Sequence, residues 1–590
     1  MVLIYHFRKE NNMKKFYKYI VVLFCSVFLL SCYDLERYPQ DELSTATFWQ
    51  NDDQAKEGIM GCYQCMRYGY IYYYHFMMDV CSDAGQGVGN GFYNITRGTW
   101  TSSTSFVLGK WQQTYEGVAR TNYVIKSLGT AKNVSDNVKA QIIGEAKFLR
   151  ALYYFNLITH FGGVPIYDET FDYENNYMDM VKPRNSIDEV RAFILKDLRD
   201  AIGALPVKWD ASNYGRATKG AAYALEGKVY LYNKQYDLAA KDFEEIVLDP
   251  SKKDYGYKLY DNLPDLFLPK GDQSDEMIFA IQNYSTAAYS LGMPFAWFMG
   301  TISTIGSCWN YLMPSNNLVD SYELKDGKPF NWDDFIPNFK ENTSVKQQTF
   351  IATLSADKKT VAQYPKYYKE LLNMYDQRDP RMQQTVLLPY THYTGWGGNK
   401  PLDCVYVCAS GIARTNGFVV PDASYWPYLY RKFVPEGDMD GLMAPTQRAN
   451  TPINYPIIRY ADVLLMLAEC YNELGKYDEA VKYINMVRQR PSTNMPKINS
   501  GPSWLEARNH DQIFERIKHE RLVEFPAEGI RYYDLIRWKQ METPMNGREL
   551  DIVDKLRYVK VFDPSKDYLW PIPQVAIDRN PNLTQNPGWQ

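Results

Sequence analysis

The feature that most constrains this sequence is a segment that has the pattern of a helical hairpin. The stretch Arg459–Pro491, RYADVLLMLAECYNELGKYDEAVKYINMVRQRP, is apolar almost all round in its first half, so that half must be buried between other helices. Its second half carries apolar residues at three- and four-residue spacing, which predicts an amphipathic helix. Gly475 separates the halves, and Pro491 ends the second because proline cannot continue the hydrogen-bond ladder. The segment therefore predicts two helices joined by a turn.

The segment Tyr223–Pro250 repeats this pattern without a gap. The matched positions are Gly227 and Ala468, Tyr230 and Tyr471, Tyr236 and Tyr477, Ala239 and Ala480, and Phe243 and Ile484. This spacing follows the tetratricopeptide pattern, in which small residues let two helices approach closely. The alternative is two unrelated helical hairpins. Against this alternative, both segments depart from the tetratricopeptide pattern in the same way. We therefore predict a mainly α fold with a tetratricopeptide-like helical-repeat body.

The composition argues against a nucleic-acid binder. The net charge is −4 and charged residues make up 23% of the chain, so the basic excess of such proteins is missing. The chain also has 50 tyrosines and 13 tryptophans, more than a core alone needs. These side chains combine an apolar face with a polar tip, which suits ligand platforms. We expect some of them to lie on the surface.

The N-terminus carries the pattern of a bacterial secretory signal. From Met13 the chain has three lysines, an apolar run at residues 19–30 and the sequence LLSC ending at Cys32. LLSC resembles a lipobox, which implies cleavage before Cys32 and acylation of its thiol. Residues 1–31 are then an upstream extension plus a lipoprotein signal peptide. The alternatives are an ordinary signal peptide or a membrane anchor, but the run is short for about 30 Å of hydrocarbon.

The cysteines do not form a recognisable metal motif. Seven follow Cys32, an odd number, so at least one thiol stays unpaired unless it links two chains. The pairs Cys62-x2-Cys65 and Cys404-x3-Cys408 could suggest zinc, but nothing supports pairing between such distant sites. We expect buried thiols, no metal site and no cofactor.

The mature chain divides into three regions by composition. Residues 32–254 have the helical pattern and form a predicted N-terminal helical region. Residues 255–455 contain many prolines, glycines and aromatics with short β-like runs, which predicts an irregular, loop-rich subdomain with a few short strands. Residues 456–590 return to helices and end in a proline-rich tail.

Five sequence blocks point to a family. They are GEAKFLRALYYFNLITHFGGVPI from Gly144, YDQRDPRM from Tyr375, IIRYADVLLMLAECYNELG from Ile457, RIKHERLVEFPAEGIRYYDLIRW from Arg516 and YLWPIPQVAIDRNPNLTQNPGW from Tyr568. Together, in this order and behind a lipobox, they resemble the SusD/RagB family of outer-membrane nutrient-binding lipoproteins of Bacteroidetes-type bacteria. The resemblance covers nearly the whole chain.

The resemblance implies a non-catalytic, glycan-binding lipoprotein of the outer membrane. Such a protein captures oligosaccharides and delivers them to a SusC-like TonB-dependent transporter. Asp34 and Glu36 resemble the acidic positions that direct lipoproteins of these bacteria to the cell exterior. Two other functions stay open: a surface glycoside hydrolase on a helical scaffold, which needs two carboxylates about 5–10 Å apart, and a peptide-binding repeat protein.

A run of charged residues in the block from Arg516 resembles an active-site cluster. Its members are Glu520, Arg521, Glu524, Arg531, Asp534 and Arg537. Buried charge must be compensated, and structural ion networks imitate catalytic sites. We expect these residues to be paired ions that hold helices together.

Two irregular stretches combine aromatic rings with amide or cationic hydrogen-bond donors. The first contains Tyr93, Asn94, Arg97 and Trp100, and the second contains Tyr284, Trp297, Trp309 and Asn310. The resemblance implies glycan contacts from loops of these two regions, without a motif that fixes individual residues. The alternative for Trp297 and Trp309 is packing in the core of the loop-rich region, since tryptophan is usually largely buried.

Overall fold

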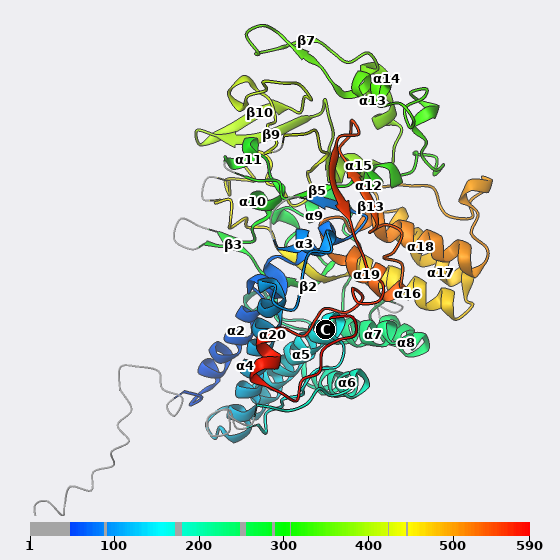
Figure 1. The fold of residues 1–590 in the computed structure, drawn as a ribbon. Helices are drawn as coiled ribbons and strands as arrows, with labels where there is room; N and C mark the ends of the chain where they lie inside the picture. The colour runs from blue at the N-terminus through cyan, green and yellow to red at the C-terminus, as the bar shows by residue number, and fades with distance from the viewer. Residues whose placement is uncertain are drawn as a thin grey trace, which may run out of the picture.

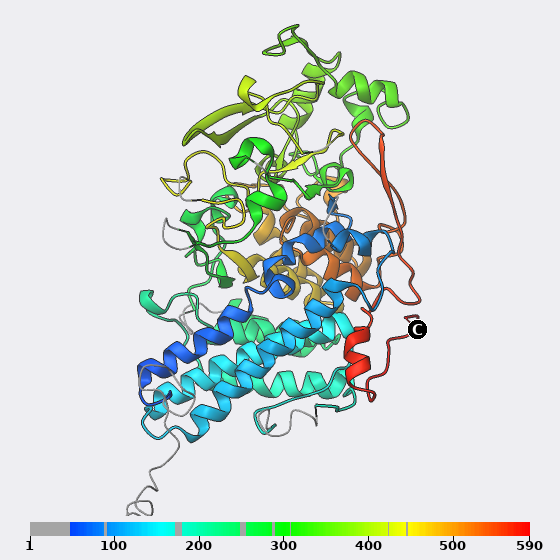
Figure 2. The same cartoon turned by 60° about the vertical axis from the view of Figure 1, so that its left-hand side comes forward.

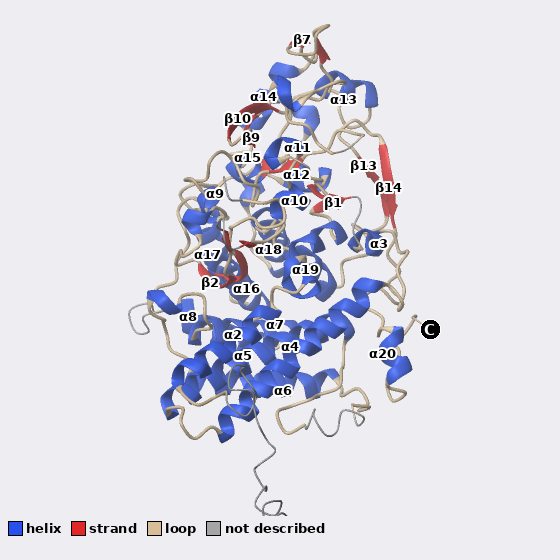
Figure 3. Ribbon diagram, turned by 90° about the vertical axis from the view of Figure 1, so that its left-hand side faces the viewer, coloured by secondary structure: helices blue, strands red, loops and turns tan. Residues whose placement is uncertain are grey.

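The protein is mainly helical, as predicted. The computed structural model describes residues 48–87, 91–171, 180–247, 255–285, 290–306, 308–422, 424–443 and 446–589. Long helices form one end of the molecule, loops and short strands form the other, and the C-terminal helices lie between them (Figures 1 and 3). The predicted signal peptide and Cys32 lie outside the described residues. The boundaries predicted at residues 254 and 455 stay predictions.

The N-terminal helices pack side by side at the helical end (Figure 2). They are α2 (Asp52–Cys65), α4 (Ser105–Thr130), α5 (Asp136–Phe161) and α6 (Ile187–Ala204). Helices α4 and α5 are so close at Gly117 that a Cβ atom there would lie 2.7 Å from the ring of Tyr153. Helix α6 begins with a capping box, in which Ser186 and Glu189 each accept a hydrogen bond from the other's backbone N–H.

The two matching segments are helical hairpins that pack against each other. The first is α7 (Lys219–Tyr232) with α8 (Tyr236–Val247), and the second is α16 (Tyr460–Glu473) with α17 (Tyr477–Arg488). Glycine is needed at position 227, where a Cβ atom would lie 2.6 Å from the ring of Phe243. The Tyr471 hydroxyl donates to Glu244 at 2.5 Å, which joins α16 to α8. The predicted helical-repeat body is therefore confirmed.

The C-terminal helices follow this second hairpin. They are α18 (His510–Glu524) and α19 (Ile530–Trp538), and Pro526 lies in the turn that separates them. The short helix α20 (Gln574–Arg579) lies in the tail, against the N-terminal helices.

The strands of the described residues form two-stranded antiparallel ladders. The pairs are β1 (Gly85–Gly87) with β5 (Leu312–Pro314), β2 (Met277–Ile281) with β12 (Tyr455–Arg459), β3 (Tyr284–Ser285) with β4 (Ser290–Leu291), β6 (Thr353–Leu354) with β7 (Val361–Gln363), β8 (Val386–Leu387) with β11 (Leu429–Tyr430), β9 (His392–Gly397) with β10 (Lys400–Val405), and β13 (Gly547–Leu550) with β14 (Leu556–Lys560). The remaining α-helices are short: α3 (Phe92–Thr96), α9 (Leu263–Leu266), α10 (Phe295–Met299), α11 (Ile302–Ile305), α12 (Asn316–Ser321), α13 (Thr343–Phe350), α14 (Tyr368–Asp376) and α15 (Pro380–Thr385). The predicted loop-rich region with a few short strands is present.

Asp79 is a buried carboxyl whose ionisation opposes folding. Its Oδ2 accepts a hydrogen bond from the Ala527 N–H at 2.6 Å, and its Oδ1 is buried with no partner among the described residues. Burial raises the pKa of Asp79 to about 7, so the folded protein holds a proton there that the unfolded chain releases near pH 4.

The pH dependence of an Asp79→Asn variant tests this assignment. From about pH 4 to pH 7 the unfolded wild type gains stability by releasing this proton, and above pH 7 the effect levels off because the folded protein releases it too, whereas asparagine stays neutral throughout. Between pH 5 and pH 8, urea unfolding should shift in favour of the variant by about 2–3 kcal/mol. The exposed Asp136→Asn variant should show a constant difference from the wild type. The same constant difference for Asp79→Asn would contradict the assignment.

Candidate functional site

A row of touching aromatic rings lies where the segment Tyr70–Tyr74 meets the loop-rich region, and we call it the aromatic ridge. Its members are Tyr70, Tyr73, Tyr74, Trp297, Phe298, Trp309 and Tyr311. Phe298 is buried and the other rings are half-buried, so they expose part of their surface. Centroid distances along the row run from 4.8 Å for Trp297–Trp309 to 6.2 Å for Tyr70–Tyr74.

Backbone hydrogen bonds position the ridge. The Trp309 N–H donates to the Trp297 carbonyl at 2.8 Å, and the Trp297 N–H donates to the Arg448 carbonyl at 2.9 Å. The Tyr73 hydroxyl donates to the Ala449 carbonyl at 2.8 Å. The three tyrosines come from a π-helical turn, Gly69–Tyr73, and the residue after it. Three segments that are distant in sequence therefore hold the rings in one arrangement.

The ridge offers neutral hydroxyls and a cation. Burial raises the pKa of Tyr73 to about 12 and also raises the pKa of Tyr74, so both hydroxyls stay protonated at neutral pH. The Arg448 guanidinium lies 4.8 Å from the ring centroid of Trp297 and 5.1 Å from that of Trp309. These groups can donate and accept hydrogen bonds next to exposed ring faces.

The structure brings together part of the second predicted stretch. Trp297 and Trp309 touch edge to face, so they lie in one place as a binding surface requires. Asn310 does not contribute, because its side chain is fully buried. Its Oδ1 accepts from the Asp422 N–H at 2.6 Å, and its backbone has a φ of +33°. Asn310 was therefore wrongly predicted as a ligand contact, since it holds two loops together.

Tyr284 lies on the short hairpin of β3 and β4 and is 60% exposed. Arg67 fixes this hairpin by donating to Asn283 Oδ1 at 2.7 Å and to the Gly292 carbonyl at 3.0 Å. Arg67 directly precedes the segment with the ridge tyrosines, so Tyr284 belongs to the same region. Its ring makes none of the ring contacts of the ridge among the described residues.

The first predicted stretch follows β1 in the chain, and β1 pairs with β5, which begins directly after the ridge residue Tyr311. Gly87 of β1 is so close to the segment before β5 that a Cβ atom would lie 2.1 Å from the Tyr311 carbonyl oxygen. Tyr93 and Asn94 are half-buried on α3, and Arg97 is exposed with its guanidinium 5.3 Å from the Tyr93 ring centroid. The Tyr93 ring contacts that of Tyr558, with centroids 4.9 Å apart, so this stretch does not join the row of rings of the ridge.

Trp100 is a core residue, so its prediction as a ligand contact was wrong. It is 2% exposed. Its ring packs against Phe106, Trp570 and Trp589, with the Trp589 centroid 4.6 Å away. The last two partners come from the C-terminal tail, which covers the face that a sugar would need.

Apart from the buried Phe298, five residues of this region were not predicted from the sequence. They are Tyr70, Tyr73, Tyr74, Tyr311 and Arg448. The signal for the first three was the dense run YGYIYYY, which exceeds what one turn of a helix can bury. The sequence carries no comparable signal for Tyr311 or Arg448, because their role depends on Trp309.

The charged residues of the Arg516 block are paired ions, as expected. Arg521 bonds Asp534 at 2.6 Å, and Glu520 and Glu524 join a larger set that we call the core ion network. Its members are Glu276, Glu323, Asp379, Arg381, Lys432, Arg459, Arg488, Arg490, Glu520, Glu524 and Glu528. All of them are buried. The network ties β12, α15, α17 and α18 together and presents no carboxylate pair to a surface ligand.

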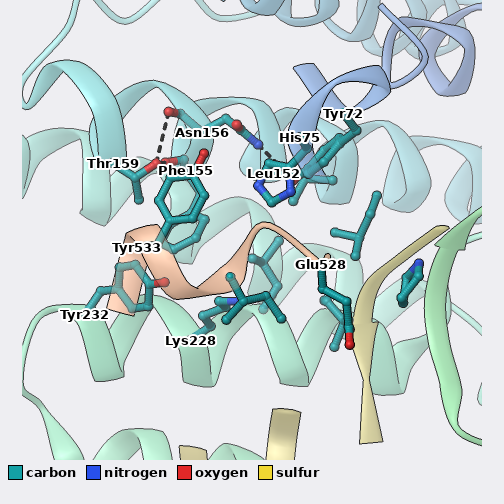
Figure 4. A pocket seen from close by; sticks show the side chains of 15 residues that line it. Tyr72, His75, Leu152, Phe155, Asn156, Thr159, Lys228, Tyr232, Glu528 and Tyr533 are labelled. Atoms are coloured by element: carbon teal, nitrogen blue, oxygen red, sulfur yellow. Dashed lines mark hydrogen bonds between the residues drawn. The ribbon is translucent and has the colours of Figure 1, made fainter. Parts of the chain in front are cut away.

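A small cavity of about 60 Å³ lies between α5, α7 and α19 (Figure 4). Its polar lining is bonded internally: Asn156 donates to the Tyr72 hydroxyl at 2.8 Å, and His75 Nδ1 shares a hydrogen bond with the Tyr455 hydroxyl at 2.7 Å. Burial lowers the pKa of His75, so the ring is neutral. The cavity has room for a few waters but not for a sugar.

The described cysteines are structural. All seven are buried thiols, and burial raises the pKa of Cys65 to about 11. Among the described residues, no group of three His, Cys, Asp or Glu side chains could hold a metal ion. In that same part of the chain, no helix has the length and apolarity needed to cross a membrane.

A helical-repeat body that carries loops with the aromatic ridge is typical of a class of binding proteins. Comparisons with known proteins identify the family. The model of the SusD family matches residues 275–589, more than half of the chain, and a second model, described as starch-binding associating with outer membrane, matches residues 35–231. The chain belongs to the SusD family.

Relatives and solved structures agree with this family. SusD-like protein P25 of Formosa agariphila is 24% identical to this chain, and the match covers 96% of this chain and 97% of the relative's length. A SusD-like protein of Bacteroides fragilis is 25% identical, with a TM-score of 0.73 over 94% of this chain and 100% of its own. Surface glycan-binding protein A of Bacteroides thetaiotaomicron, solved in complex with laminarihexaose, is 20% identical, with a TM-score of 0.60 over 91% of this chain and 99% of its own.

Proposed function

We propose that this protein is a non-catalytic, cell-surface glycan-binding lipoprotein. The aromatic ridge is the observation that carries the proposal. Sugars present flat C–H faces and rings of hydroxyls, which fit half-exposed aromatic rings beside hydrogen-bonding groups. Membership of the SusD family supports a binding role, and so does the related fold of a protein solved with laminarihexaose.

A polysaccharide panel tests the proposal. The mature chain should retain at least one polysaccharide in affinity electrophoresis and release no reducing ends from it. Release of reducing ends would favour the alternative of a glycoside hydrolase. Capture of peptides without retention of any carbohydrate would favour a peptide-binding repeat protein.

We propose that Cys32 carries the membrane anchor. Each buried methylene of an acyl chain contributes about 0.8 kcal/mol, so several chains make release from the membrane negligible. A Cys32→Ala variant should therefore appear in the soluble fraction, whereas the wild type sediments with outer membranes. Substitution of the downstream thiol Cys62 should leave the wild-type distribution unchanged. If Cys32→Ala still sediments after a salt wash, the lipid anchor is wrong.

We propose that the protein delivers its glycan to a SusC-like TonB-dependent transporter. A lipid-tethered binding protein can concentrate a ligand at the outer surface, but import requires a channel. Affinity isolation from gently solubilised outer membranes should recover a large β-barrel partner. Isolation of the lipidated chain alone would count against this partnership, while leaving glycan binding intact.

A further inference from the structure

A second cavity at the helical end differs in chemistry from the aromatic ridge. It is a groove of about 260 Å³ between α5, α6, the end of α7, and α19 with the segment after β14. Its apolar lining consists of Phe155, Ile158, Ile187, Val229, Ile536 and Leu569. Phe155, Thr159, Tyr232 and Tyr533 also line the small cavity of Figure 4, so these side chains lie between the groove and that cavity.

The charged lining of this groove has one sign. Four cationic side chains line it, Arg191, Lys234, Arg537 and Lys539, and none of its described lining residues is acidic. Arg537 is compensated by Glu469 at 2.7 Å, and Arg191 by Asp188 at 2.8 Å. Within the described chain, no ion pair joins Lys234 or Lys539 to a carboxylate. The groove therefore has an apolar floor and an excess of positive charge at its rim.

The two lysines without an ion pair have an unusual backbone. Lys234 follows α7 with a φ of +58°, and Lys539 follows α19 with a φ of +57°. This left-handed conformation after a helix is usually taken by glycine. Burial lowers the pKa of the Lys539 ammonium, which lies 3.8 Å from the ring centroid of Tyr568; nearby Glu542 opposes this shift and Lys234 adds to it. Two like charges thus line the same groove, at residues where glycine would fit better.

We propose that this groove binds a single-chain anionic amphiphile of the fatty carboxylate class. Charge complementarity places the carboxylate between Lys234 and Lys539, where it relieves their mutual repulsion. The acyl chain lies on the apolar floor and is removed from water there. The site is separate from the aromatic ridge, so the two ligands bind independently.

Titration calorimetry with decanoate on the full mature chain tests the site. The wild type should bind decanoate, and decanol, which lacks the charge, should bind at least tenfold more weakly. The variants Lys234→Gly and Lys539→Gly remove one charge each without straining the backbone. Each should weaken decanoate binding several-fold, and the double variant about tenfold.

The same variants distinguish carboxylate binding by the two lysines from a structural role of these lysines at the ends of α7 and α19. If the lysines bind the carboxylate, the glycine variants lose affinity while their melting temperature stays equal or rises. Lys358 has a φ of +58° in an exposed turn far from the groove, so Lys358→Gly should leave decanoate affinity unchanged. Failure of the wild type to bind decanoate, or equal affinity in the double variant, would overturn the proposal. Glycan affinity should be the same in all of these variants, so the result does not depend on the aromatic ridge.

Discussion

Replacing Glu524 with glutamine is expected to lower the free energy of unfolding by about 3–5 kcal/mol at neutral pH. Glu524 accepts from Arg490 at 2.9 Å, Arg459 at 3.0 Å and Arg381 at 3.2 Å, and all four side chains are buried. Glutamine keeps the size of the side chain but removes its charge. Three buried guanidiniums would then have lost a shared counter-ion, which is costly in a medium of low polarity.

Urea unfolding of matched variants measures this effect. The control is Glu479→Gln, which breaks a surface pair with Lys482 of 3.0 Å and should cost less than about 1 kcal/mol. Nearby arginines hold the pKa of Glu524 down at about 2, so its contribution is present above about pH 4.5 and is lost as pH falls from there to 2. Similar unfolding midpoints for the two variants at pH 7 would contradict the assigned role of the network.

Replacing Trp309 with alanine is expected to weaken glycan binding by roughly ten- to hundredfold. Its half-buried ring touches both Trp297 and Tyr311, with centroids 4.8 and 5.1 Å away, so it lies at the middle of one arm of the ridge. Loss of one stacking ring removes about 1–3 kcal/mol of binding free energy. Trp297→Ala should act in the same direction.

Isothermal titration with the polysaccharide retained from the panel measures this loss. Trp504 is 39% exposed in the turn Ser503–Leu505 and lies outside the ridge, so Trp504→Ala is the matched control and should bind normally. Trp100→Ala is unsuitable as a probe of binding, because removing a core tryptophan costs about 3–5 kcal/mol of stability. If Trp309→Ala melts like the wild type and binds with the same affinity, the ridge is not the glycan site.

The helical body could be predicted from the sequence because its determinants are local. The apolar spacing in α16 and α17, the turn at Gly475 and the matching segment at α7 and α8 all lie within about thirty residues each. The sequence could also predict that Glu520 and Arg521 each pair with an opposite charge elsewhere, since unpaired charge is not tolerated in a buried helix. Their individual partners could not be predicted.

The ligand surface was decided by tertiary contacts. Trp100 and Trp309 look alike in the sequence, each within an irregular, polar stretch, but the C-terminal residues Trp570 and Trp589 cover Trp100. Tyr74 becomes part of the ridge because it meets Phe298, more than two hundred residues further on. Local pattern therefore determined which segments are helical and which are irregular. Exposure of each aromatic ring depends on which distant segment packs on it, and the free energy of that packing exists only in the assembled fold.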